Sequence, residues 1–174
     1  ELPDAALNVL KKESTRALVD ARSNVFHVLR ERYENGDKRQ TLIDAICSYV
    51  PMTKNGRSEL LKSCMEKLKN HQDLELTLPL LQASISNTTN YIYSTVSSSD
   101  GHELLSSVCD CIGDSDVTRY LPLLTKAATS ISDELTEEEY NRLLSITAPL
   151  LCSSEDACGV HSKLISKSLL TQDM

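Results

Sequence analysis

Residues 58–70 read SELLKSCMEKLKN, and this stretch shows most clearly how the chain folds. An α-helix completes a turn every 3.6 residues, so side chains three and four positions apart share one face. In this stretch the apolar side chains recur at those spacings: Leu60, Leu61, Cys64, Met65 and Leu68. Charged and polar residues fill the other positions. We therefore predict an amphipathic helix over 58–70 that buries one face.

The segment before it carries a similar pattern. A helix over 39–50 ends at Pro51 and places Leu42, Ile43, Ile46, Cys47 and Val50 on one side. Between the two helices, Lys54-Asn55-Gly56 favours a turn in a loop over 51–57.

The chain opens with Leu2-Pro3-Asp4, which suits a helix start, and helical spacing continues toward Asn35-Gly36. Those two residues tolerate the left-handed conformation that ends helices. The pattern fits one helix of about 30 residues or two helices that break near Ser23-Asn24. Its apolar residues are Leu7, Leu10, Ala17, Leu18, Ala21, Val25, Val28 and Leu29.

Helical patterns also continue through the second half. Residues 76–99 form a helical stripe, although serine, threonine and β-branched residues weaken its propensity. Two capping boxes predict helix starts, Asp100 with Glu103 and Thr136 with Glu139. The predicted helices run over 100–112, 116–131, 136–152 and 157–170.

The composition agrees with an all-α fold, since the 174 residues include only 5 Gly, 5 Pro, one Phe and no Trp. We predict an antiparallel bundle of about seven or eight helices in a single domain over 1–174, with 1–70 and 71–174 as an optional division into sub-units. One internal likeness offers an alternative, because LPLL at 78–81 recurs at 121–124. Paired helices that repeat about every 40 residues resemble HEAT or armadillo units, which stack as helical hairpins.

Charge is divided unevenly along the chain. Residues 1–69 carry 13 lysines and arginines against 10 acidic residues, a net charge of +3. Residues 70–174 carry 5 against 15, a net charge of −10, and residues 70–118 hold no lysine or arginine. We therefore expect neither nucleic acid nor anionic lipid as a partner. No apolar run reaches the length of about 18 residues that spans a membrane.

Six cysteines permit full pairing. A bridge from Cys47 to Cys64 and another from Cys152 to Cys158 are feasible, but Cys109 and Cys111 on one helix point about 200° apart. An alternative joins Cys109 and Cys111 to Cys152 and Cys158. Buried thiols are the competing interpretation. Disulfides and the sequon at 87–89 favour a secreted protein over a cytoplasmic or nuclear one.

No pattern indicates catalysis. The histidines, His27, His71, His102 and His161, have no nucleophile elbow or glycine-lined loop nearby. The cysteine spacings do not match the usual zinc motifs. We expect no catalytic residue, no cofactor and no metal.

Two functional hypotheses follow. The first is a non-catalytic helical module that binds another protein, because residues 77–99 carry almost no charge and are rich in adaptable contact residues. Its candidate surface is Asn87, Asn90, Tyr91 and Tyr93. The alternative is a secreted, disulfide-stapled helical carrier of a small apolar ligand or lipid.

Overall fold

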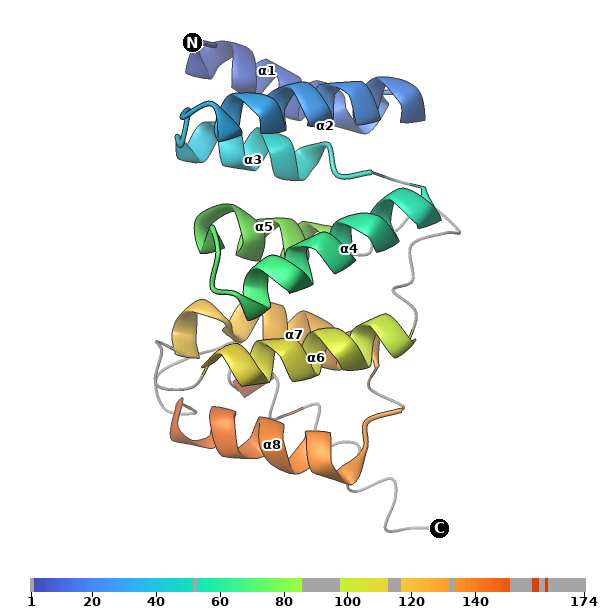
Figure 1. Cartoon of the computed structure of the whole chain (residues 1–174), viewed down its shortest axis with the longest axis vertical. Helices are drawn as coiled ribbons and strands as arrows, with labels where there is room; N and C mark the ends of the chain where they lie inside the picture. Colours follow the sequence, from blue (N-terminus) through green and yellow to red (C-terminus); the bar gives the residue numbers. More distant parts are fainter. Residues whose placement is uncertain are drawn as a thin grey trace. The chain divides into compact units, whose positions relative to one another are not determined.

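The protein is built from α-helices (Figure 1), as the sequence predicts. The computed structural model describes residues 2–51, 53–85, 98–112, 117–131, 134–150, 158–159 and 162. Within these residues there are eight α-helices, three short 3₁₀ helices and no strand. The 3₁₀ helices are Ser14–Arg16, Val117–Arg119 and Ala148–Leu150.

The chain forms two compact units, of which the first comprises residues 1–64 and 73–94. In this unit α1 packs against α3, and α3 packs against both α2 and α5. Figure 1 shows α1, α2 and α3 side by side. The helices are α1 (Asp4–Glu13), α2 (Val19–Glu34), α3 (Gln40–Ser48), the first part of α4 (Lys54–Lys69) and α5 (Leu74–Ile85).

The second unit comprises residues 65–72 and 95–174. Here α6 packs against both α7 and α8. Lys69 Nζ forms an ion pair with Glu103 Oε1 at 3.3 Å, and the Cys111 thiol donates to the Leu68 carbonyl oxygen at 3.2 Å. The helices are the end of α4, α6 (Ser98–Ile112), α7 (Leu121–Ser130) and α8 (Glu137–Thr147).

Both units bury aliphatic side chains, with tyrosine as additional volume: Tyr33 and Tyr49 in the first unit and Tyr120 in the second. The predicted stripe of 58–70 is confirmed, since all five of its apolar residues are buried. The buried side chains of the first unit include Leu7, Phe26, Leu29, Tyr33, Leu42, Ile46, Tyr49, Leu60 and Leu81. Those of the second include Leu68, Leu104, Leu105, Val108, Leu121, Leu124, Ala127 and Leu143.

The N-terminal segment is two helices, but the predicted break near Ser23-Asn24 is wrong. The break lies earlier, where Ala17 and Leu18 adopt extended backbone conformations between the first 3₁₀ helix and α2. The guanidinium of Arg22 donates to the Ser14 carbonyl oxygen and so ties α2 to the start of that 3₁₀ helix. Gly36 ends α2 as predicted, with a φ of +109°.

The buried face of α2 also differs from the predicted apolar stripe. Its buried residues are Arg22, Phe26, Leu29 and Tyr33, whereas Leu18 and Val28 are exposed. The aromatic rings fill the interior better than the smaller valines do, and Arg22 finds backbone acceptors there.

Three predicted helix starts are wrong, and one is confirmed. The helix predicted over 116–131 begins at Leu121 as α7, after the 3₁₀ helix Val117–Arg119. α4 begins at Lys54, where a turn was predicted, because Thr53 Oγ1 accepts the Gly56 N–H at 3.2 Å and satisfies a donor of the first turn. α6 begins at Ser98, so Asp100 lies inside the helix instead of capping it. The capping box of Thr136 and Glu139 is present at α8.

Other predictions about the fold stay open. The predicted helix over 76–99 corresponds to α5, with residues 86–97 outside the described part of the chain. The predicted C-terminal helix over 157–170 falls almost entirely outside it as well. The single domain and the HEAT-like arrangement stay predictions.

Candidate functional site

The predicted interaction surface is not placed. Asn87, Asn90, Tyr91 and Tyr93 lie outside the described residues. The earlier part of the same low-charge segment belongs to α5, where Thr77 and Ser84 are 1% exposed. The described part of the segment therefore packs inside the first unit, and another surface must be considered for binding.

No disulfide joins any two of the described cysteines, Cys47, Cys64, Cys109, Cys111 and Cys158, and Cys152 lies outside the described residues. The feasible Cys47–Cys64 bridge is thus not formed. Burial raises the pKa of the Cys47 thiol to about 12 and that of Cys109 to about 11. These two groups stay protonated near neutral pH and are poor nucleophiles.

Only one described histidine meets a carboxylate. His102 on α6 lies with Nδ1 2.7 Å from Glu139 Oε1 on α8, and it hydrogen-bonds to no other described side chain. His27 is exposed on α2, where its ring contacts Phe26 edge-on. His71 lies in a turn with a φ of +51°, and His161 is outside the described residues.

The Glu139 carboxylate has a structural role in the capping box. Burial acts to raise its pKa, but hydrogen bonds from Thr136 and His102 outweigh burial and lower it. Beside it, Arg142 pairs with Asp110 at 2.5 Å, and a cavity of about 230 Å³ lies between α6 and α8. No nucleophile is held against the imidazole in the described residues, so these contacts hold α6 to α8.

A second hollow is a groove between α2 and α4 in the first unit, with a volume of about 400 Å³. Each helix contributes one face at helical spacing. The α2 wall is Val19, Asp20, Ser23, Phe26, His27 and Arg30. The α4 wall is Gly56, Glu59, Leu60 and Ser63, and Pro51 and Thr53 close the end where both helices begin.

The groove has an apolar floor and a polar rim. Phe26 and Leu60 are buried at 2% and 6% exposure, so they form the floor. Ser23, Gly56 and Ser63 are too small to fill the space above them. α2 packs on α3, whereas α2 and α4 approach each other too little to close the gap.

The closed end of the groove is held by local contacts. The Arg57 Nε–H donates to the Pro51 carbonyl oxygen at 2.9 Å. A methyl group at Gly56 would lie 2.8 Å from Thr53 Oγ1 and 3.0 Å from Pro51 Cβ. Glycine at this position thus lets the chain before α4 fold closely onto its first turn.

The charged rim is incompletely paired. Arg30 Nε donates to Glu34 Oε1 at 3.0 Å, so its charge is already balanced. Asp20 and Glu59, on opposite walls, have no ion pair or hydrogen bond to their carboxylates among the described residues. Two negative charges therefore face the groove without a paired cation in the part of the chain that the structure describes.

Sequence reasoning missed this groove because its residue types are ordinary. The signal was present in the face of α2 that carries Val19, Ser23, Phe26 and Arg30, but we assigned the apolar stripe to other positions. Only the folded structure shows that this face of α2 lies opposite α4.

Comparison with protein-family models, with curated proteins and with solved structures finds no match for this chain. The described residues contain no group of three or more His, Cys, Asp or Glu side chains arranged to hold a metal ion. Among the described helices, none combines the length and the apolar character needed to span a bilayer. The groove is therefore judged by its own geometry.

Proposed function

We propose that this chain is a non-catalytic helical module that binds another protein through the groove between α2 and α4. The observation that carries the proposal is the groove itself: two helix faces line an apolar floor of Phe26 and Leu60 beneath a polar rim. Apolar grooves between helices accept apolar side chains of a partner, and the rim gives specificity.

Exposed apolar side chains beside the groove support the proposal. Val19 lines the groove and is 48% exposed, and its neighbour Leu18 is 79% exposed. Contact with water by adjacent large apolar side chains is unfavourable, and burial against a partner removes it. Such a patch next to a groove is typical of interaction sites.

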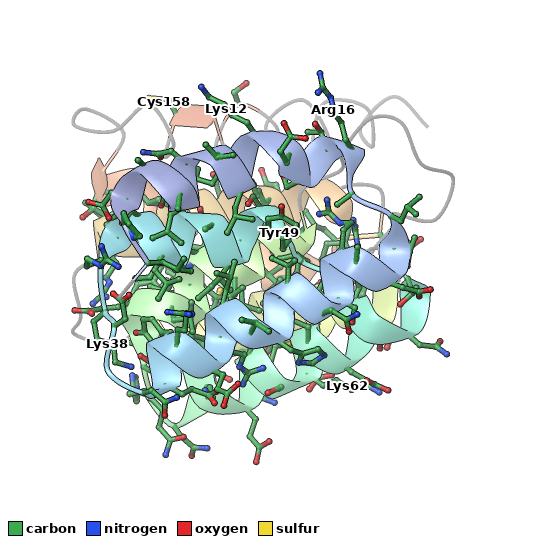
Figure 2. All side chains as sticks on the ribbon, turned by 90° about the horizontal axis from the view of Figure 1, so that it is seen from above. Lys12, Arg16, Lys38, Tyr49, Lys62 and Cys158 are labelled. Carbon is green, nitrogen blue, oxygen red and sulfur yellow. The ribbon has the colours of Figure 1, made fainter. Side chains whose placement is uncertain are left out.

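Site-specific photo-crosslinking tests the proposal. A benzophenone amino acid replaces Ser63 on the groove wall, Ser23 on the facing wall, or Lys62, which projects away from α4 in Figure 2. The proteins are irradiated in an extract of the source cells, and adducts are identified by mass spectrometry. We expect positions 23 and 63 to capture the same protein and position 62 not to capture it. Equal capture at 62, or no adduct at either wall, contradicts the proposal.

The carrier hypothesis stays a prediction without a supporting observation. A lipid site is lined mainly by apolar side chains, whereas four of the groove residues, Asp20, His27, Arg30 and Glu59, are ionisable. The disulfides expected to staple such a carrier do not join the described cysteines. Mass spectrometry after organic extraction tests it, since a carrier should release a lipid in amounts comparable to the protein.

A further inference from the structure

We infer that the groove between α2 and α4 selects a cationic amphipathic helix of the partner protein, with basic side chains toward Asp20 and Glu59 and apolar ones on Phe26 and Leu60. This inference rests on the proposed function, and it specifies the chemistry of the partner. It follows from the charge, the floor and the length of the groove.

The charge of the groove indicates that the partner segment is positively charged. Asp20 and Glu59 are exposed and have no positive partner among the described residues, while Arg30 is neutralised by Glu34. An anionic segment in the groove would meet two uncompensated carboxylates, whereas lysine or arginine would pair with them. Complementary charge of this kind favours the correct partner and accelerates its encounter.

The floor requires apolar side chains as well. Phe26 and Leu60 lie at the bottom of the groove, one from each wall, and Val19 adds apolar surface where α2 begins. A purely basic segment would leave Phe26 and Leu60 without an apolar contact. A partner segment with both basic and apolar side chains pairs with the carboxylates of Asp20 and Glu59 and also covers the apolar floor.

Length favours a short helix. From Asp20 to Arg30 the groove wall extends over ten residue steps along α2, which is about 15 Å at 1.5 Å per step. A partner helix of about ten to twelve residues covers the same distance. It would present apolar side chains at positions i, i+3 or i+4, and i+7, the usual anchors of a helix in a groove.

Synthetic peptides test the inference on the whole chain. The probes are a fluorescent twelve-residue amphipathic leucine–lysine peptide, its leucine–glutamate counterpart, and a scrambled leucine–lysine peptide. Fluorescence anisotropy gives the affinities at low and moderate salt. We expect the amphipathic leucine–lysine peptide to bind at least tenfold more tightly than both others, with an affinity that falls as salt rises.

Matched charge variants separate the groove from general attraction to an acidic protein of net charge −7. Asp20→Asn with Glu59→Gln removes the groove carboxylates. Glu31→Gln with Glu66→Gln removes two exposed carboxylates from the same helices outside the groove. All four residues are exposed, so the variants should fold normally. We expect the groove pair to weaken binding at least tenfold and the control pair less than threefold.

Three outcomes overturn the inference. The first is equal binding of the leucine–glutamate peptide, and the second is an equal effect of the groove and control pairs. The third is occupation by a second copy, seen as self-association in sedimentation that Leu18→Glu abolishes. If any of these occurs while positions 23 and 63 still capture one different protein, the proposed function survives and only the partner chemistry is wrong.

Discussion

Replacement of Arg22 should destabilise the first unit more than any exposed substitution, because this guanidinium joins three segments. Arg22 is only 8% exposed, although it carries a full charge. It donates to the backbone carbonyl oxygen of Ser14, to that of Ser48 at 2.7 Å and to that of Val50 at 3.4 Å. Ser14 is the first residue of the first 3₁₀ helix, Ser48 is the last residue of α3, and Val50 follows α3.

Two further features support the buried charge. Helix C-termini carry partial negative charge, which favours a cation at the end of α3. The guanidinium carbon also lies 5.6 Å from the ring centre of Tyr49, whose hydroxyl donates to the Leu10 carbonyl oxygen at 2.8 Å. Figure 2 shows Tyr49 among the helices, while Arg16 projects away from them.

The magnitude follows from these contacts. A hydrogen bond from a charged donor contributes about 1.5–3 kcal/mol, and a buried acceptor left without its donor costs about 1–3 kcal/mol. Arg22→Met keeps the side-chain length but removes the donors, so we expect a loss of about 3 kcal/mol in the free energy of unfolding. Arg22→Lys should lose about half as much, because an ammonium keeps the charge but cannot reproduce the planar fork.

Urea denaturation followed by circular dichroism measures this loss. Arg16→Met is the matched control, since the Arg16 side chain is 81% exposed and lies 3.9 Å from Glu13 in a weak ion pair. We expect the control to change the free energy of unfolding by less than about 0.5 kcal/mol. A cost below about 1 kcal/mol for Arg22→Met would contradict the conclusion that Arg22 holds the three segments together. Equal effects at positions 22 and 16 would contradict it as well.

Three smaller predictions concern the backbone, acid stability and thiols. Gly36→Ala should cost about 1 kcal/mol in thermal unfolding because φ is +109° there. Gly159→Ala, at a helical position in open space, should be neutral or slightly stabilising, and equal costs at the two positions would contradict this. Hydrogen bonds from Arg39 lower the pKa of Asp37 to about 2, so its contribution to stability is present above the unfolded pKa of about 4 and is lost as pH falls toward 2. Asp37→Asn should remove that part of the acid dependence in melts between pH 2 and pH 6, and an unchanged profile would count against it. In native protein, a thiol reagent should label exposed Cys158 rapidly and buried Cys111 only on unfolding, and fast labelling of Cys111, located by mass spectrometry, would disprove the assignment.

Local patterns predict the helices of this chain well. The stripe over 58–70 and the capping box at Thr136 depend on residues within two turns of each other, so sequence spacing contains the information. The start of α4 was missed for a local reason. Asn55-Gly56 is typical of turns, but the Thr53 hydroxyl caps the helix and allows both residues to lie inside it.

Contacts between helices could not be predicted in the same way. The pair of His102 and Glu139 joins residues 37 positions apart, and no spacing rule relates them. Arginine is seldom buried, so residue type alone favours an exposed position for Arg22. Its burial becomes intelligible only when the carbonyls of Ser14 and Ser48 converge on it.

The open groove contributes less to the stability of the first unit than a filled contact between α2 and α4 would. Ser23 and Ser63 lie beside Phe26 and Leu60, and larger apolar side chains there would bury additional area at about 25 cal/mol per Å². Folding alone therefore does not require an open groove, and the small residues keep the apolar floor accessible. Within the described residues, Asp20 and Glu59 likewise have no ion pair, whereas Arg30 is paired with Glu34. Unfilled apolar space and unpaired charge thus occur together at one site, which favours a site that is completed by a partner.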